Sequence, residues 1–425
     1  MADGMRSAEE NGAAVVGSRI EDARIFNRRL VFETIFQRGP ISRVETARLV
    51  GLKPQTISSI TRELLDQELI AEAGRSTGLR GQPQIYLEPN ARAGFSVGVH
   101  LDRDYCILVV CDLKRTELVH RELTFDTTNP KDALERIAAA IDAALKEARA
   151  PRDKVWGIGL VLPTFGSDVY DFDFSMPHWE AWRNVSFAED LRALSGLPVL
   201  VENDATAAAI GERFNRQHIA NAVFAYFYVG HGTGCGLIID GVPFKGAGGN
   251  AGEAGLLPVF GLDGSPTWPD VQTTDVLSLR GIATALGVEE SSLTVESMGQ
   301  LHAMRDHRLM EWVVTAARAL RDVVAIIEVM FDPEFIVTGG PLPRSLVESL
   351  VDRAYPLRPT PAARRDRARP RLAAAELMED AAARGAAMLP IFVNTSPNFR
   401  HLYVRQIPRD ERPFDQVANS AAQDR

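Results

Sequence analysis

The chain has 425 residues, 45% of them hydrophobic, and a formal net charge of −9. This length predicts two or three domains with substantial cores, and no apolar run approaches the roughly 18 residues of a membrane span, which excludes a membrane partner. The three cysteines form no CxxC or His/Cys cluster and the N-terminus lacks a signal-peptide core, so we expect a cytoplasmic protein without disulfides or metal.

The charge is unevenly distributed along the chain. Residues 24–87 contain 10 Lys and Arg against 6 Asp and Glu, a net +4 that leaves −13 for the remainder. A modestly basic segment joined to an acidic body suits a protein that touches DNA with one end only.

The N-terminal part of the chain begins with small and polar residues, and we expect residues 1–20 to be disordered. Apolar residues at helical spacing then predict a helix over residues 24–37, which Gly39-Pro40 ends. A domain therefore begins close to residue 21.

The next segment carries the signals of two further short helices. Ser42 can cap a helix over residues 44–50, Gly51 makes a tight turn, and Pro54 suits the first turn of a third helix. Two short helices joined by a Gly-containing turn are typical of helix-turn-helix domains.

The outward face of the third helix carries short hydrogen-bonding groups and one long cation. Such side chains can reach base edges and phosphates when the helix lies in the major groove. A plain three-helix bundle, which also has a polar outer face, is the alternative. The candidate DNA-binding residues are Gln55, Thr56, Ser58, Ser59 and Arg62.

Residues 69–87 contain two short apolar strands around a loop rich in Gly, Arg and Ser. This pattern predicts the wing of a winged helix, so that residues 21–88 form one DNA-binding domain. Arg75, Arg80 and Gln82 near the loop would contact phosphates or the minor groove. A solvated hairpin without function is the alternative.

The body that follows repeats one order of elements. Three antiparallel strands near residues 95–125, a helix, a strand and a helix precede a second series that begins near Phe224. We expect two similar α/β lobes, residues 91–215 and 216–395, with a ligand cleft between them. Further helices are predicted over 271–286, 310–330, 344–354 and 378–388; the last can pack back on the first lobe, and residues 396–425 form a mobile tail.

Asn203 and Asp204 follow a short buried strand and precede an Ala-rich helix. Polar groups at this place in an α/β sheet lie where such folds bind ligands. A carboxylate here can hydrogen-bond a ligand hydroxyl or accept its proton. The alternative is that both residues only cap the helix.

These motifs together resemble the ROK family of repressors and sugar kinases, and its repressor branch in particular. The matching segments are Pro198 to Glu212, Gly230 to Gly236, Gly249-Asn-Ala-Gly-Glu253 and Thr338-Gly-Gly340. The resemblance implies an actin-like, sugar-kinase-like body of two lobes behind a winged helix-turn-helix domain.

The departures from the family bear on catalysis and metal binding. Kinases of the family open with Asp-x-Gly-Gly-Thr, whose glycines let backbone N–H groups approach ATP phosphates, whereas this chain has His100-Leu-Asp-Arg-Asp104. We therefore expect neither an enzyme nor a nucleotide cofactor, and the Gly-Thr-Gly hairpin becomes a structural turn. The family's zinc-binding histidine is replaced by Leu256 and no cysteine follows, so no zinc is expected.

The resemblance also implies a sugar site. The family's sugar-contacting Asn after a Pro is replaced by His178, beside Trp179 and Trp182, which form either an aromatic wall for a ring or part of the core. The candidate ligand-binding residues are His178, Asn203, Asp204, Asn250 and Glu253.

These expectations combine into a repressor of carbohydrate genes that binds a double-stranded DNA operator and a carbohydrate effector. A homodimer or a dimer of dimers would place two heads on DNA half-sites. The first alternative is a ROK sugar kinase with a fused DNA-binding domain, which the retained Asp204 favours. The second is a regulator whose body senses no small molecule.

Overall fold

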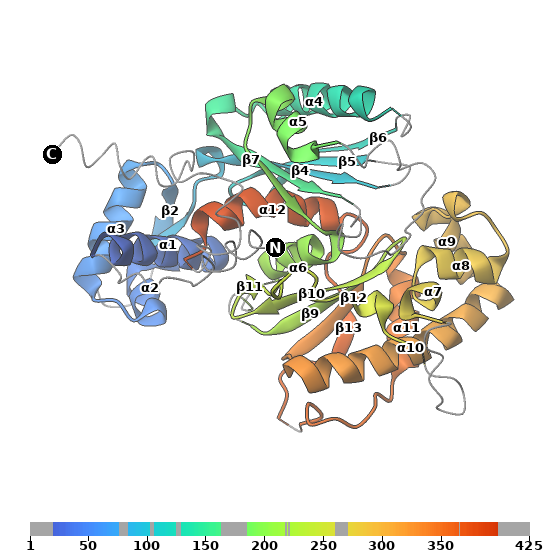
Figure 1. Cartoon of the computed structure of the whole chain (residues 1–425). Helices are drawn as coiled ribbons and strands as arrows, with labels where there is room; N and C mark the ends of the chain where they lie inside the picture. Colours follow the sequence, from blue (N-terminus) through green and yellow to red (C-terminus); the bar gives the residue numbers. More distant parts are fainter. Residues whose placement is uncertain are drawn as a thin grey trace, which may run out of the picture.

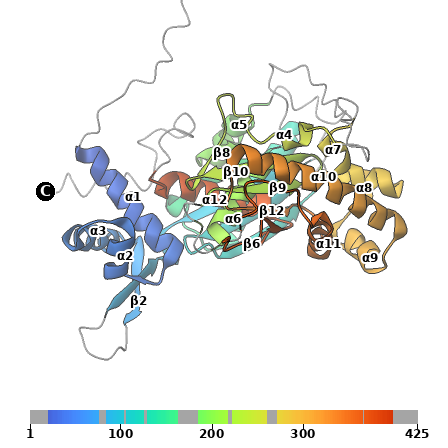
Figure 2. The ribbon, with the colours of Figure 1, turned by 90° about the horizontal axis from the view of Figure 1, so that it is seen from below.

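The computed structural model describes residues 20–75, 84–102, 106–124, 129–162, 185–216, 219, 222–259, 271–364 and 366–397. The disorder expected for residues 1–20 and the mobile tail expected for residues 396–425 fall outside this part of the chain, except at residues 20, 396 and 397. The described residues form a small N-terminal head beside a body of two stacked α/β lobes (Figure 1). Figure 2 shows the molecule from below: the head lies beyond one end of the body, and β2 extends away from the head.

The head is a three-helix bundle with a three-stranded sheet in the order β1-β3-β2. Its helices are α1 (Ile20–Arg38), α2 (Arg43–Val50) and α3 (Pro54–Asp66), and its strands are β1 (Ile41–Ser42), β2 (Ile70–Arg75) and β3 (Ile85–Pro89). The predicted local signals are present: the Ser42 hydroxyl accepts the Glu45 N–H at 3.2 Å, and Gly51 ends α2 with φ of 70°. The first helix begins at Ile20, earlier than the predicted Arg24.

The two lobes have sheets of the same topology. The first sheet has the order β6-β5-β4-β7-β8 and the second the order β11-β10-β9-β12-β13, each with three antiparallel strands followed by two parallel ones. The first sheet consists of β4 (Phe95–Leu101), β5 (Cys106–Asp112), β6 (Glu117–Leu123), β7 (Val155–Val161) and β8 (Val199–Glu202). The second consists of β9 (Phe224–Val229), β10 (Thr233–Ile239), β11 (Val242–Pro243), β12 (Phe335–Gly339) and β13 (Leu372–Ala374). The prediction of two similar α/β lobes is confirmed.

The helices of the body cover the outer faces of the sheets and fill the space between them (Figure 1). Lobe 1 carries α4 (Pro130–Glu147) and α5 (Phe187–Ser195). Lobe 2 carries α7 (Thr273–Val276), α8 (Leu279–Leu286), α9 (Val295–Ala303), α10 (His307–Phe331) and α11 (Arg344–Ala354). The single helix predicted over residues 271–286 is two helices, because Ser278 caps a new one through the Gly281 N–H at 3.0 Å.

Two helices, α6 (Asp204–Asn215) and α12 (Ala381–Thr395), lie against each other between the sheets. Helix α6 follows the last strand of the first sheet and packs on β9 and β10 of the second, whereas α12 packs on β4 and β7 of the first. Side chains at the contacts are small: a Cβ on Gly159 would collide with the Ala386 carbonyl oxygen, and one on Gly385 with that of Ala207. This close approach holds the two lobes together through one helix pair.

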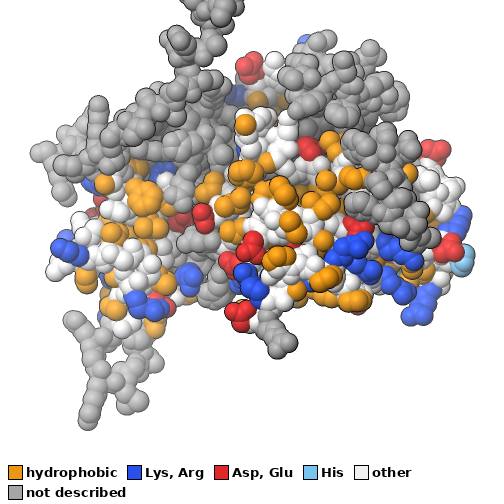
Figure 3. All heavy atoms as spheres, turned by 60° about the horizontal axis from the view of Figure 1, so that its bottom comes forward, with side chains coloured by type: hydrophobic (Ala, Val, Ile, Leu, Met, Phe, Trp, Pro, Cys, Tyr) orange, Lys and Arg blue, Asp and Glu red, His pale blue; other side chains and the backbone are white. Residues whose placement is uncertain are grey.

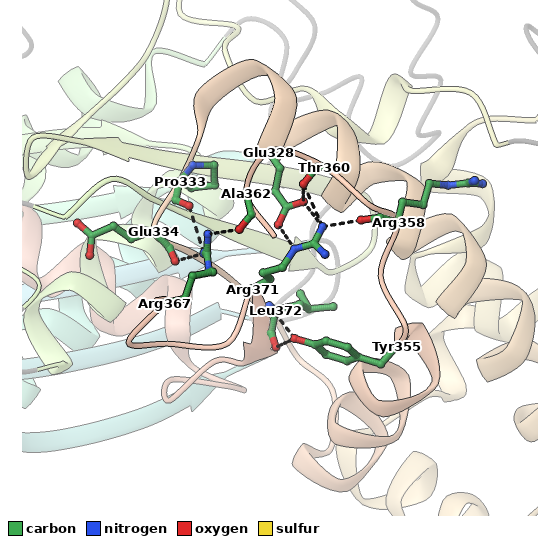
Figure 4. Close-up of polar contacts among 10 residues, drawn as sticks. All are labelled: Glu328, Pro333, Glu334, Tyr355, Arg358, Thr360, Ala362, Arg367, Arg371 and Leu372. Atoms are coloured by element: carbon green, nitrogen blue, oxygen red, sulfur yellow. Dashed lines mark hydrogen bonds and ion pairs between the residues drawn. The ribbon is translucent and has the colours of Figure 1, made fainter. Parts of the chain in front are cut away.

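Lobe 2 is closed at its outer edge by the connection from α11 to β13, shown in Figure 4. The Arg371 guanidinium donates to both carboxylate oxygens of buried Glu328, which also accepts the Thr360 hydroxyl at 2.7 Å. The Tyr355 hydroxyl donates to the Leu372 carbonyl at 3.0 Å. These bonds fix a connection whose described residues, 355–364 and 366–371, form no helix or strand.

The head and the body share a continuous apolar core. Glu33 of α1 forms a 2.5 Å ion pair with Arg213 of α6, and the Arg213 side chain is 2% exposed. Beside it, the ring of Phe36 meets that of Phe214 edge to face, with centroids 5.6 Å apart. The head is therefore seated on the C-terminal end of α6.

No helix in the described part of the chain is long and apolar enough to cross a membrane. The face in Figure 3 carries Lys and Arg side chains on the head at its left and a larger group of them at the opposite end of the body. Hydrophobic side chains occupy much of the surface between these two regions.

Candidate functional site

The outer face of α3 is open to solvent. Ile57 and Leu64 point inward and are fully buried, while Gln55, Ser58 and Ser59 are exposed. Arg62 is also exposed and Thr56 is half-buried. The helix is held in this orientation because Arg43 of α2 donates to its Thr61 hydroxyl and Arg28 of α1 pairs with its Glu63. Its hydrogen-bonding groups are thus presented on one unobstructed surface.

The wing strands β2 and β3 pair in antiparallel fashion beside this helix. Arg75, the last residue of β2, is exposed. Arg80 and Gln82, the other two predicted wing contacts, lie outside the described residues. An α-helix with an exposed polar face and an adjacent wing that ends in an arginine can enter the grooves of DNA.

A second group of polar residues lies at the N-terminus of α6. The Asn203 side chain accepts the Thr206 N–H at 2.7 Å and so caps the helix. Asp204 occupies the first helical position, and its carboxylate accepts the Ala205 N–H at 2.7 Å. Asn203 therefore has the capping role that we kept as an alternative, which leaves its amide N–H₂ group for a ligand.

Asp204 is half-buried in an acidic environment. Burial, the nearby Asp102 carboxylate and the Glu253 carboxylate together raise the pKa of Asp204 to about 7. Glu253 follows Gly252, which has φ of 95° and packs so closely on the Cys235 carbonyl that a Cβ would not fit. The glycine-rich segment is thus held against β10, with Asn250 and Glu253 exposed and the Glu253 carboxylate near Asp204.

Two polar contacts join the lobes around Asp204. Asp102, just after β4 of lobe 1, lies 3.7 Å from Nε2 of His231 in the β9–β10 turn, whose Nδ1 is 2.5 Å from the Glu290 carboxylate. On the other side, Lys245 after β11 pairs with Glu202 of β8 at 2.7 Å. The structure therefore brings groups of both lobes to the carboxyl end of the first sheet.

The contacts of the β9–β10 turn support the interpretation of this segment as a structural turn. The Thr233 hydroxyl donates to the Leu277 carbonyl and is buried. Gly234 and Gly236 allow Ala205 of α6 to pack directly on β10, since a Cβ at either glycine would collide with that residue. The glycines here position α6 against the second sheet.

The comparison with known proteins identifies the family. The model of the ROK family matches residues 96–391, which is more than half of the chain. The chain belongs to the ROK family. An uncharacterized protein of Sinorhizobium fredii, y4fQ, is 30% identical over 77% of this chain and 81% of its own length.

Other ROK relatives carry names that describe a role. The chain is 25% identical to the DNA-binding transcriptional repressor Mlc of Escherichia coli, over 77% of this chain and 83% of that protein. It is 25% identical to the xylose repressor of Caldicellulosiruptor bescii, over 74% of this chain and 82% of that protein.

Solved ROK structures share the fold. A ROK family transcriptional regulator, described as a homolog of E. coli Mlc, superposes with a TM-score of 0.61 over 87% of this chain and 96% of its own, at 24% identity. A ROK glucokinase from Streptomyces griseus gives 0.53 over 70% of this chain and 99% of its own, also at 24% identity. The predicted fold class is therefore confirmed.

The structure brings together some of the predicted ROK site residues and adds others. Asp204 and Glu253 are close enough to interact electrostatically, and Asn203 precedes Asp204. His178, the predicted ring contact, lies outside the described residues. His231 and Lys245 were not among the predicted ligand-binding residues, although His231 lies inside the Gly230 to Gly236 segment that carries the family resemblance. No local motif marks Lys245.

Proposed function

We propose that this chain is a sequence-specific DNA-binding transcriptional regulator, a repressor of genes of carbohydrate metabolism. A sugar or sugar derivative bound between the lobes controls it. The observation that supports this most strongly is that one chain joins an exposed α3 face to a body in which groups of both lobes meet near Asp204, through the buried Glu33–Arg213 pair. The names of the ROK relatives support the same role.

The proposed contacts divide between the two ends of the molecule. The exposed face of α3 and the wing bind operator DNA, while the cleft binds hydroxyl groups of the effector. The DNA contacts are Gln55, Thr56, Ser58, Ser59, Arg62, Arg75, Arg80 and Gln82. The effector contacts are His178, Asn203, Asp204, Asn250 and Glu253.

Effector binding acts through the relative arrangement of the lobes. A ligand shifts such an equilibrium only by its difference in affinity for the two arrangements. We propose a cytoplasmic homodimer, or a dimer of dimers, in which this shift changes the spacing of two heads on their half-sites. Light scattering at several protein concentrations tests the assembly, and a monomer under all conditions contradicts it.

Two variants and a control test the assignment of DNA binding to the head and of effector binding to the body. The affinity of the full chain for DNA is measured by fluorescence anisotropy, with DNA taken from the promoter region of the gene that encodes the chain. Its affinity for a panel of sugars is measured separately. Arg62→Ala should weaken DNA binding and leave sugar affinity unchanged, and Glu253→Ala should do the reverse. Arg318→Ala, an exposed arginine on α10, should change neither. Exchanged effects of the first two variants contradict the assignment.

A sugar kinase with a fused DNA-binding domain is the second candidate. The ROK glucokinase fold and the half-buried Asp204, whose pKa of about 7 suits a general base, favour it. Against it, the Asp102 carboxylate lies at the end of β4, where it would repel phosphate. Sustained ATP consumption with any hexose or amino sugar, abolished by Asp204→Asn, would replace our proposal with this one.

A body that senses no small molecule is the remaining rival. A ligand at 100 times its dissociation constant stabilises the native state by roughly 2.7 kcal/mol. Thermal unfolding with sugars and sugar phosphates should therefore show a clear shift for the effector. A melting curve that no carbohydrate moves refutes the sensing role and leaves the DNA-binding role untouched.

A further inference from the structure

A cavity of about 260 Å³ lies at the opposite end of α6 from Asp204. It is formed where the turn between β5 and β6 meets the last residues of α6 and the first half of α12. Phe214, which lines it, is ten residues along the helix from Asp204, or about 15 Å at 1.5 Å per residue. This cavity is therefore separate from the polar residues at the N-terminus of α6.

The polar lining of the cavity is mainly cationic. Lys114 pairs with Glu88 of the head at 2.6 Å, and Arg384 pairs with Glu117 at 3.1 Å, so each of these cations has an acidic partner. Arg115 differs: its contacts are a 2.6 Å bond to the Phe214 carbonyl and the face of Phe36, 5.2 Å from the ring centroid. Among the described residues no carboxylate pairs with it.

The Arg115 guanidinium thus contributes a positive charge that no ion pair among the described residues compensates. It is half-buried, and burial lowers its pKa. One of its five N–H donors caps the C-terminal end of α6, which is a sufficient structural role for a cation at this position. The remaining donors form the fork that recognises carboxylates and phosphates.

The backbone at Arg115 provides an independent observation. Its φ is 68°, in the left-handed region that favours glycine. The Asp112 carboxylate accepts the N–H groups of Lys114 at 2.8 Å and Thr116 at 2.9 Å, and so holds the turn in this conformation. A glycine would form the same turn without the roughly 1 kcal/mol of strain. An arginine side chain therefore lines this cavity from a turn position that would favour glycine.

We propose that this cavity binds a small organic oxyanion, with Arg115 as its main contact and Lys114 as a second. Its volume is below the roughly 300–1,000 Å³ of sites for drug-sized ligands, so the ligand has only a few carbon atoms. Both contact residues also touch the head, Arg115 through Phe36 and Lys114 through Glu88. The bound anion therefore lies at the joint between the head and the body.

The test compares three probes that share a three-carbon skeleton by calorimetric titration of the full chain at constant ionic strength. D-glycerate carries a carboxylate, glycerol 3-phosphate carries a phosphate, and glycerol is the neutral control. At least one of the two anions should bind, and the stronger one identifies the group that the site prefers. Glycerol should not bind at this site.

Three variants locate the bound anion. Arg115→Gly suits the turn and should weaken anion binding at least tenfold. Arg149→Gly is the matched control, because Arg149 is an exposed arginine with φ of 52°, and it should bind the anion as the parent chain does. Asp204→Asn should also leave anion binding unchanged.

Three results would overturn the proposal. They are the absence of binding by both anions, equal binding to the parent chain and Arg115→Gly, and loss of binding in Asp204→Asn alone. The last result would place the anion in the cleft and would leave the proposed effector site standing.

Discussion

The buried ion pair between Glu33 and Arg213 allows a quantitative prediction about how the head is held. Their side chains are 11% and 2% exposed, and the Arg213 guanidinium also lies over the rings of Phe214 and Phe392. Removal of one partner from a buried pair destabilises a protein by about 3–5 kcal/mol, because the other charge stays buried without compensation. Glu33→Ala should therefore weaken the docking of the head on α6 by up to this amount.

The destabilisation caused by Glu33→Ala has an upper limit, which is set by the free energy with which the head docks on the body. Release of the head returns Arg213 to water, so the penalty cannot exceed the free energy that holds the head on α6. Hydrogen exchange of α1 amides should accelerate in Glu33→Ala while exchange in the sheets of the body stays unchanged. The double variant Glu33→Leu, Arg213→Met should recover most of the protection, because an apolar pair of similar volume replaces the charges without a desolvation penalty.

The control is the exposed pair between Arg24 and Glu63, 3.3 Å apart, in which Arg24 is 65% exposed. Surface pairs contribute about 0–1 kcal/mol, so Arg24→Ala should change the protection of α1 only slightly. In Glu33→Ala the effector should still bind but should no longer alter operator affinity. Equal effects of Glu33→Ala and Arg24→Ala on hydrogen exchange would refute the reasoning.

Further predictions concern the cleft and the body. Since the folded state holds the Asp204 proton up to about pH 7 and the unfolded chain releases it near its ordinary value of 3.8, stability falls as pH rises through this window. The free energy of unfolding should fall by a few kcal/mol between pH 5 and pH 8, at about 1.4 kcal/mol per pKa unit. Asp204→Asn should remove this fall, as measured by urea unfolding at the two pH values. Gly385→Ala should force α12 away from the Ala207 carbonyl and lower stability by about 1–3 kcal/mol in the same assay. Glu328→Ala leaves Arg371 without its carboxylate and should cost about 3 kcal/mol by thermal unfolding; an unchanged midpoint in either body variant contradicts the packing described here.

Local signals predicted the head and most of the body well. The Ser42 cap, the Gly51 turn and Pro54 at the start of α3 are all contained within a few residues, and the structure has each of them. The helix over Arg344–Ala354 has the predicted limits. Such features depend on the chain within one or two turns, which is the range over which a sequence pattern acts.

Elements that depend on tertiary packing were placed less well. The last helix was predicted over residues 378–388, and proline, here Pro390, usually breaks a helix. Helix α12 continues to Thr395, since it is buried between the sheets and the Asn394 side chain bonds the Pro390 carbonyl at 2.8 Å. Strand β13 was missed because only its parallel pairing with β12 defines its three residues.

The candidate site also combines residues that a local pattern predicts with residues that only tertiary packing brings together. The sequence placed Asn203 and Asp204 together at the end of a strand, since both follow β8 directly. His231 and Lys245 reach the same region from the second lobe, through packing of α6 on β10. A contact between residues so far apart in the chain leaves no local pattern, and it becomes visible only when the two sheets are assembled.

The position of α12 has a consequence for synthesis of the protein. The first sheet is complete once Glu202 has been made, yet the helix that covers its inner face begins only at Ala381. At about 5–20 residues per second, the ribosome needs roughly 10–40 s to cross this interval. During that time an apolar face of the nascent chain stays open to water, and chaperones have a defined period in which to bind it.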